Sequence, residues 1–230
     1  MIPWSGLVVY YSFEPSTVSG TTLLNLGGGG AAFNGQLVNG TAISTTDGYT
    51  AGSASLQLAA SSSQYVQVPA FSTGSTGLTF ACWFRSNNNN GDESRIFDFG
   101  NGENSDNLLV RILWNYLGIS VRLGGVYYEY LNLIPNVNDN VWRHFAWTLT
   151  SSGAWVVYIN GVSAWTSTGR YYPNAMTRTN NYIGKSNNPD PYYTGAIDEF
   201  RIYSTALGAS AVYALYGKSL YAMYVDSKMS

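Results

Sequence analysis

The sequence predicts an all-β domain in which short antiparallel strands form a sandwich or barrel. Short runs rich in β-branched and aromatic residues recur along the chain, and Gly and Asn clusters separate them at intervals of about 8 to 12 residues. Of the 230 residues, 45% are hydrophobic, which is enough to bury a large core in one domain. We therefore expect one domain over residues 1–217, followed by a C-terminal tail at 218–230 that packs weakly.

The N-terminal part predicts one buried strand followed by a long irregular segment. Residues 6–13 form an apolar run, whereas residues 14–54 are rich in Gly, Ser, Thr and Asn and predict coil with two short strands. Strands are expected at 36–38, 42–43, 55–58, 64–68 and 78–85.

The middle of the chain continues the strand pattern. Its loop at 87–93 is rich in Asn, and we interpret it as a tight turn rather than as low-complexity disorder. Strands are expected at 95–99, 108–114, 117–123 and 126–133.

The C-terminal part predicts a closing hairpin and one short helix. Residues 182–184 read as a short strand that ends at a turn glycine, and residues 195–203 alternate apolar and polar side chains. Residues 206–217 carry apolar side chains at helical spacing and end on Gly217, a suitable helix cap. Further strands are expected at 142–149 and 155–159.

The C-terminal motifs resemble the laminin-G-like branch of the concanavalin A-like lectin/glucanase superfamily over roughly residues 6–217. The most specific matches are the Trp142/His144/Ala146/Thr148 pattern, the turn at 158–161 and the run 195–203 with Ala206-Leu207. This resemblance implies a two-sheet antiparallel jelly-roll sandwich with one short C-terminal helix. It also implies a carbohydrate- or protein-binding module rather than an enzyme, although one sandwich hosts many functions.

Composition limits the partners. Only 10% of residues are charged, 11 basic against 13 acidic, so the surface favours neutral hydroxylated ligands over nucleic acid. No segment approaches the roughly 18 apolar residues of a membrane-spanning helix. The start of the chain lacks the features of a secretory signal, and we expect the domain to be a piece of a larger extracellular or particle-surface protein.

A catalytic role finds little support in the sequence. Glycoside hydrolysis needs two carboxylates about 5 to 9.5 Å apart, yet Asp198 and Glu199 are adjacent and are expected on opposite strand faces, while Asp98 and Glu129 stand alone. His144 is the only histidine, and we interpret it as a packing residue. Cys82 is the only cysteine and is interpreted as a small buried hydrophobe.

A structural calcium ion is the one cofactor that the resemblance implies. In many members of the superfamily an acid near the end of the chain and oxygens of the early loop hold Ca²⁺. Here that set would be Asp198 with Glu14, a less typical match, and backbone carbonyls of residues 31–35. The alternative is that Asp198 caps a turn or pairs with Arg201.

The aromatic residues are the best candidates for binding. The chain has 19 tyrosines and seven tryptophans, and sugars stack on aromatic rings while their hydroxyls need polar partners. The alternative is that these rings only cover sheet faces, since aromatic residues favour strands. The candidate ligand-binding residues are Trp114, Tyr116, Tyr128, Tyr130, Tyr192 and Tyr193, with Arg111, Arg122, Asn101 and Asp106 as polar partners.

The function expected from the sequence is non-catalytic recognition of a glycan by aromatic stacking and neutral hydrogen bonds. One alternative is a polysaccharide lyase, in which a tyrosine acts as acid or base and Lys185, Arg111 or Arg122 neutralises a uronate. Another is a structural or adhesion module on a virion or cell surface that binds protein.

Overall fold

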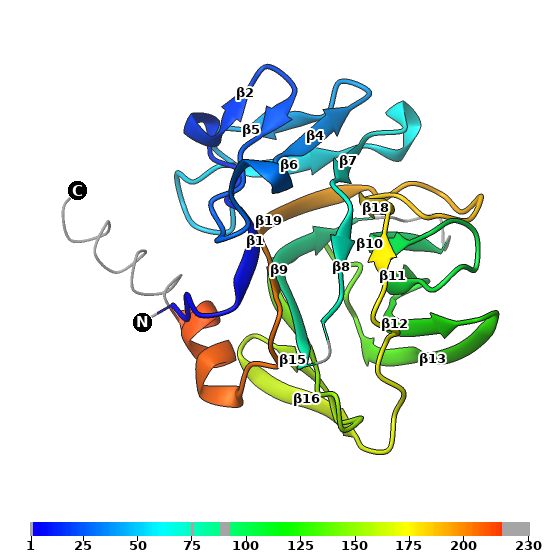
Figure 1. Ribbon diagram of the computed structural model, residues 1–230. Helices are drawn as coiled ribbons and strands as arrows, with labels where there is room; N and C mark the ends of the chain where they lie inside the picture. The colour runs from blue at the N-terminus through cyan, green and yellow to red at the C-terminus, as the bar shows by residue number, and fades with distance from the viewer. Residues whose placement is uncertain (1, 75, 88–92, 218–230) are drawn as a thin grey trace.

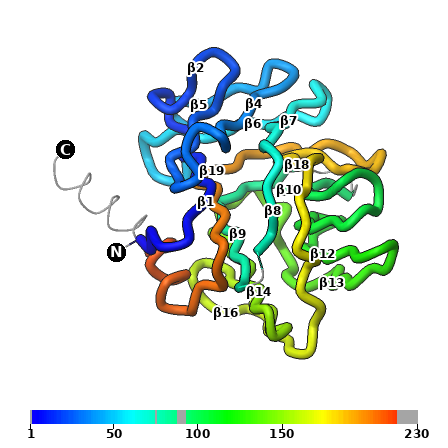
Figure 2. Tube along the Cα trace, viewed as in Figure 1, coloured from blue at the N-terminus to red at the C-terminus, as the bar shows by residue number. Residues whose placement is uncertain are grey.

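The computed structural model describes residues 2–74, 76–87 and 93–217, and it forms a sandwich of two large antiparallel sheets (Figure 1). The predicted two-sheet architecture is confirmed. Neighbours within each sheet are often far apart in sequence, as β1 and β19 are, so the fold depends on long-range pairing (Figure 2). The predicted tail at 218–230 and most of the predicted turn at 87–93 lie outside the described residues.

Sheet A has the strand order β16-β15-β14-β9-β19-β6-β5, and β1 also pairs with β19. Its longest strands, β9 and β19, lie side by side in the middle of the sheet. The strands are β1 (Leu7–Tyr11), β5 (Ala42–Ser44), β6 (Ser55–Leu58), β9 (Leu78–Ser86), β14 (Arg143–Leu149), β15 (Trp155–Ile159), β16 (Val162–Ser167) and β19 (Gly195–Tyr203).

Sheet B has the strand order β13-β12-β11-β10-β18-β7-β4-β3-β2. Its strands are β2 (Val18–Ser19), β3 (Thr22–Leu23), β4 (Gly35–Val38), β7 (Tyr65–Val68), β10 (Ser94–Gly100), β11 (Leu108–Leu113), β12 (Tyr116–Leu123), β13 (Val126–Pro135) and β18 (Asn180–Ile183). A separate pair joins β8 (Phe71–Ser72) to β17 (Thr177–Arg178). Short 3₁₀ helices lie at η1 (Pro15–Thr17), η2 (Gly30–Phe33) and η3 (Ala60–Ser62).

Aromatic side chains fill the space between the two sheets. Phe97 of sheet B packs against Phe80 of sheet A at 4.8 Å between ring centres and against Phe200 at 5.8 Å. All three side chains are fully buried. Each such ring contributes on the order of 1.5–3 kcal/mol through its removal from water.

A β-bulge interrupts the alternation of β19. The pairing with β9 shifts between Asp198 and Arg201, and Glu199 has a φ of 53°. As a result Ile197 and Phe200, three residues apart, both point into the core. The prediction that Asp198 and Glu199 lie on opposite faces is therefore wrong, because the bulge brings both carboxylates to the outer side of sheet A.

A helix over residues 209–217, coloured orange in Figure 1, covers the outer face of sheet A. Val212 and Leu215 of this helix pack against Ala81 and Ala146 on the sheet. His144 is fully buried on the same face, beside Trp83, as the packing interpretation expects. No helix among the described residues is long and apolar enough to cross a bilayer.

Candidate functional site

The outer face of sheet B carries a network of charged and polar side chains. Alternation along the strands turns Val110 and Ile119 into the core and sends their neighbours outward. Cross-strand register then aligns one outward row across the sheet. This row consists of Glu129, Ser120, Leu109, Asp98, Tyr182 and Gln67.

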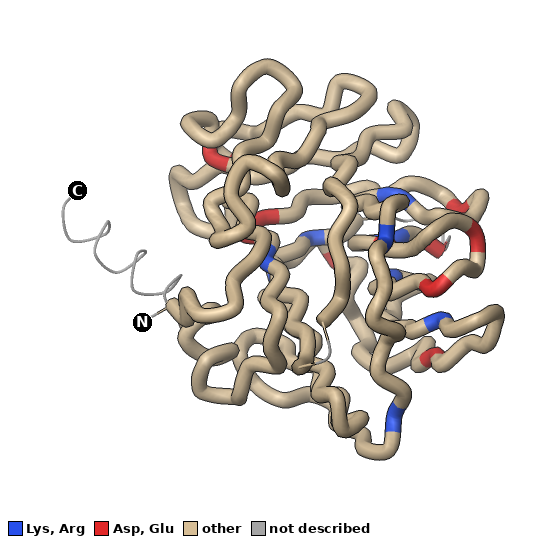
Figure 3. The backbone as a smooth tube through the Cα atoms, viewed as in Figure 1, with Lys and Arg blue, Asp and Glu red and all other residues tan. Residues whose placement is uncertain are grey.

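An ion-pair ladder runs over β10 to β13 on this face, where Figure 3 shows charged positions gathered. Arg95 contacts Asp190 at 2.6 Å and Glu93 at 2.8 Å. Glu93 also pairs with Arg111, which lies 3.2 Å from Glu129. Glu129 in turn lies 3.3 Å from Arg122, so the ladder is Asp190, Arg95, Glu93, Arg111, Glu129 and Arg122.

The arginines of the ladder are buried, and its three arginines are matched by three carboxylates. The side chains of Arg95, Arg111 and Arg122 are 1%, 5% and 6% exposed. A guanidinium at such depth needs carboxylate partners, because its desolvation would otherwise cost several kcal/mol. Burial by itself would raise the pKa of the Glu93 carboxyl, but Arg95 and Arg111 outweigh burial and lower it. The predicted ligand contacts Arg111 and Arg122 are thus engaged within the protein.

A loop over residues 184–194 lies on the centre of the sheet and is held there by Asp98. The fully buried carboxylate of Asp98 accepts hydrogen bonds from the Asn187 backbone at 2.9 Å and from the side chains of Asn187 and Asn107 at 3.0 and 2.8 Å. Asp98 is therefore an anchor for the loop.

Two residues of this loop, Lys185 and Tyr192, meet Tyr65 of β7 and Tyr182 of β18, and these four side chains form the tyrosine cluster. The ring of Tyr65 meets that of Tyr182 edge-on at 5.6 Å and that of Tyr192 at 6.1 Å between centres. The Lys185 ammonium lies 4.2 Å from the centre of Tyr182 and 4.7 Å from that of Tyr65. All four side chains are partly exposed.

The backbone around Gly184 explains how strand and loop residues meet. Gly184 has a φ of +83°, and a Cβ there would lie 2.5 Å from Leu58, so the turn needs glycine. The Tyr193 amide donates to the Gly184 carbonyl at 2.9 Å and closes the loop. This closure brings Tyr192 to Tyr65, whereas the ring of Tyr193 is fully buried in the core.

The other predicted aromatic residues lie elsewhere. Trp114 and Tyr116 are 67% and 39% exposed at the turn between β11 and β12. Asn101 and Asp106 lie at the opposite end of β11, in the loop from β10. The structure does not bring these four residues together.

Tyr128 and Tyr130 point to the inner side of sheet B rather than to its outer face, because they lie opposite the core residues Val121 and Ile119. Tyr130 packs against Trp165 of sheet A at 4.5 Å, and Tyr128 packs against Tyr171 at 4.0 Å between ring centres. Tyr127 is the outward residue of this strand, with the Arg122 guanidinium 4.7 Å from its ring centre.

Sequence reasoning missed Tyr65 and Tyr182 as candidate ligand contacts. Alternation places Tyr65 and Gln67 on the face opposite Val66, which was a usable signal. The position of Tyr182 beside Tyr65 depends on pairing between β18 and β7, which lie more than 100 residues apart and leave no local trace in the sequence.

The two carboxylates proposed for calcium, Asp198 and Glu14, lie close enough to repel each other electrostatically. Asp198 is 1% exposed, and burial, reinforced by Glu199 and Glu14, raises the pKa of its carboxyl well above the usual range. Arg201 pairs with Glu199, so the Arg201 pairing suggested for Asp198 is not formed. No cluster of three or more His, Cys, Asp or Glu ligands occurs in the described part of the chain. Two carboxylates with backbone carbonyls would fit the hard-oxygen preference of Ca²⁺.

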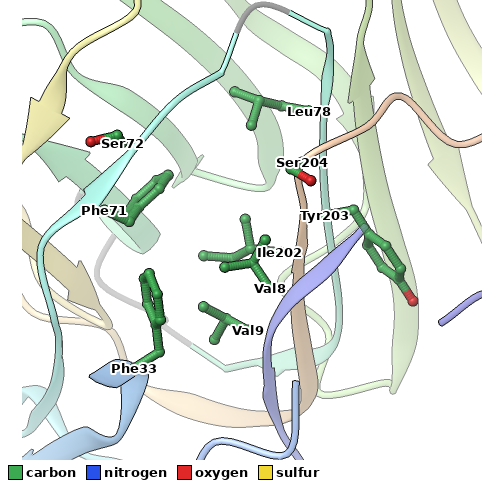
Figure 4. Close-up of a pocket in the computed structure, with 9 residues that line it drawn as sticks. All are labelled: Val8, Val9, Phe33, Phe71, Ser72, Leu78, Ile202, Tyr203 and Ser204. Carbon is green, nitrogen blue, oxygen red and sulfur yellow. The ribbon is translucent and has the colours of Figure 1, made fainter. Parts of the chain in front are cut away.

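Two hollows in the described part of the chain differ in size and position. One hollow lies between Phe33, Phe71 and Ile202, as Figure 4 shows. Its volume is about 40 Å³. A space of this volume holds only a few water molecules and is too small for a sugar ring. A wider hollow of about 330 Å³ lies near Val18 and Ile43 at the edge of the sandwich.

Comparison with known proteins places the chain among β-sandwich domains. In sequence it is 28% identical over 153 residues to the rat protein "Sushi, von Willebrand factor type A, EGF and pentraxin domain-containing protein 1". That match covers 60% of this chain and 4% of the much longer rat protein.

The solved structures that share the fold include an arabinanase domain and a neurotoxin binding domain. Domain 4 of AbnA, an extracellular GH43 arabinanase from Geobacillus stearothermophilus solved with arabinotriose, has a TM-score of 0.66 and 22% identity, covering 93% of this chain and all of that domain. The binding domain of botulinum neurotoxin DC, solved in complex with SialylT, has a TM-score of 0.69 and 14% identity, covering 93% of this chain and 52% of that one.

A family model matches residues 60–213, which is most of the sandwich from η3 to the C-terminal helix. The model describes concanavalin A-like lectins and glucanases and is of laminin-G type. The chain therefore belongs to the concanavalin A-like lectin/glucanase superfamily.

Proposed function

We propose that this domain is a non-catalytic recognition module that binds a glycan at the tyrosine cluster on the outer face of sheet B. A sugar ring stacks on Tyr182, Tyr65 or Tyr192, and its hydroxyls bond to neutral groups such as Gln67. Single-site affinity is then on the order of millimolar to micromolar and rises when copies act together.

The observation that carries the proposal is the convergence of three partly exposed tyrosines from β7, β18 and the 184–194 loop. The outer face of sheet A is covered by the helix, whereas these rings remain accessible on sheet B. A group of rings on a rigid sheet offers a stacking surface without the entropy cost of ordering a loop.

The related domains support this role by analogy. The arabinanase domain was solved with arabinotriose, and the neurotoxin domain with SialylT. One belongs to an extracellular enzyme and the rat relative is a multidomain protein. We infer by the same analogy that this domain acts outside the cell as part of a larger protein.

The tyrosine cluster favours binding over a lyase reaction. A tyrosine that acts as base needs a pKa brought toward neutrality. Burial, with added repulsion from neighbouring tyrosines, instead raises the pKa of Tyr65 and of Tyr182. Of the three cations suggested for a lyase, Arg111 and Arg122 are paired with glutamates and are not free to neutralise a uronate. Lys185 stays open to a ligand, so it is the raised pKa of the tyrosines that disfavours a lyase.

A glycan array with wild-type protein tests the proposal. Tyr182→Ala and Tyr65→Ala should each weaken binding of the strongest glycan by about fivefold, since one lost stacking contact is worth on the order of 1 kcal/mol. Tyr213→Ala is the matched control, because Tyr213 is 57% exposed on the helix over the other sheet. An array without signal, together with tight binding to a protein, would instead favour the adhesion alternative.

A further inference from the structure

We propose that Lys185 makes the tyrosine cluster selective for glycans that carry a carboxylate, by pairing its ammonium with the acid group of a uronic or sialic-type sugar. This inference rests on the proposed glycan-binding function and names the class of ligand for that site.

The first argument is the position of the Lys185 ammonium. It lies 4.2 Å from the centre of the Tyr182 ring and 4.7 Å from that of Tyr65, so two ring faces fix it within the cluster. An ammonium has three N–H donors, so contacts with two rings leave at least one of them for an oxygen acceptor.

The second argument is the absence of a carboxylate partner. Among residues 2–74, 76–87 and 93–217, no acidic group lies within ion-pairing distance of Lys185. Asp190, the acid of the same loop, is held by Arg95 at 2.6 Å and by the Ser186 hydroxyl at 2.8 Å. The loop therefore directs its own carboxylate away from the lysine.

The third argument is the contrast with the rest of the face. Arg95, Arg111 and Arg122 each contact at least one carboxylate of the ion-pair ladder. Within the described part of sheet B's outer face, Lys185 is then the cation left for a ligand. Partial burial lowers its pKa, which means that water solvates the charge incompletely and that an incoming anion would replace missing solvation.

The geometry also favours a carboxylate on a sugar over a free anion. A stacked ring at Tyr192 or Tyr65 brings a substituent of that ring to the ammonium that lies over the same cluster. An acidic sugar then gains both the stacking contact and the charge contact, whereas a small anion gains only the charge contact.

The test uses glycans in pairs that differ in the acid group. Galacturonic acid trimer and its methyl ester, a hyaluronan tetrasaccharide and its methyl ester, and sialyllactose and lactose are arrayed with wild-type protein. We expect the acidic member of at least one pair to bind about tenfold more tightly. Lys185→Gln should remove this preference while leaving the affinity for the neutral member within twofold.

Arg143→Gln is the matched control, because Arg143 is a cation on sheet A paired with Asp139. It should leave the preference intact, and thermal melts of both variants check the fold. Equal binding of acidic and neutral members by wild-type protein, or a preference that survives in Lys185→Gln, overturns the inference and leaves the proposed function standing. A further comparison uses chondroitin sulfate, which carries carboxylates, and dextran sulfate, which carries none. If the wild-type protein binds both polymers equally, it selects for negative charge alone, and the inference is overturned. Failure of every glycan to bind removes the proposed function itself.

Discussion

Arg111 and Glu129 form an ion pair of 3.2 Å although they belong to β11 and β13, two strands that do not pair with each other. The strand between them opposes Arg111 with Gly118 and Glu129 with Ser120. A Cβ at Gly118 would lie 2.7 Å from the backbone carbonyl oxygens of Tyr130 and Leu131, so glycine lets β13 approach β12 closely beside this ion pair. The ion-pair ladder thus ties together strands that backbone hydrogen bonds join only indirectly.

The variant Glu129→Gln should destabilise the protein by about 2 kcal/mol, because it leaves the buried Arg122 without its carboxylate and Arg111 with one partner. Urea unfolding measures the change. Asp139→Asn is the control, since Asp139 is 42% exposed and its pair with Arg143 should contribute no more than about 1 kcal/mol. If both variants lose the same free energy of unfolding, the buried ion-pair ladder stabilises the protein no more than an exposed ion pair does.

Stability should fall as the pH drops from 7 toward 4, and His144 should account for part of the fall. Burial, aided by Arg201, lowers the pKa of His144 from 6.5 to about 3. Below pH 6.5 the unfolded chain therefore binds a proton at His144 that the folded protein does not bind. This difference lowers the free energy of unfolding by about 2 kcal/mol at pH 5.

Urea unfolding of His144→Leu at pH 7 and pH 5 isolates this contribution. The variant should lose clearly less stability than the wild type over this interval. Identical losses would mean that His144 accepts a proton in the folded protein.

Calcium binding at Asp198 and Glu14 remains a proposal with a direct thermal test. If Ca²⁺ neutralises the buried Asp198 carboxylate, EDTA should lower the melting temperature by several degrees, and added Ca²⁺ should restore it. Asp198→Asn should melt at the same temperature with and without EDTA. If EDTA leaves the melting temperature of the wild-type protein unchanged, the calcium proposal is wrong.

The variant Trp114→Ala should leave glycan affinity within twofold of wild type, even though Trp114 is the most exposed aromatic side chain among the described residues at 67%. The reason is that the turn from β11 to β12 is separated from the tyrosine cluster by β10 and β11 in the sheet. Titration with the strongest array glycan checks this, and a tenfold loss would move the site to that end of the sheet.

The sequence was sufficient for the architecture because strand identity is local. Alternation over β19 and β14 and the Gly and Asn turns predict strands without knowledge of their partners. The sequence did not predict the bulge in β19. Glu199 adopts a left-handed φ there, and this lets Ile197 and Phe200 both pack into the core.

The candidate site was less accessible to sequence reasoning. Tyr192 was selected for its place in an aromatic pair, but which member of that pair is buried depends on how the loop closes at Gly184. Arg111 looked like a free cation until the fold placed Glu93 and Glu129 beside it. Contacts between distant strands decide such cases, and no local pattern encodes them.

The central claim is that a glycan binds on the outer face of sheet B at the tyrosine cluster. An amide NMR titration of labelled protein with the strongest array glycan tests it most directly. The account predicts that the largest shifts fall on residues 65–67, 180–185 and 192. Shifts concentrated instead at the turn around Trp114, or on the helix at 209–217, would contradict it.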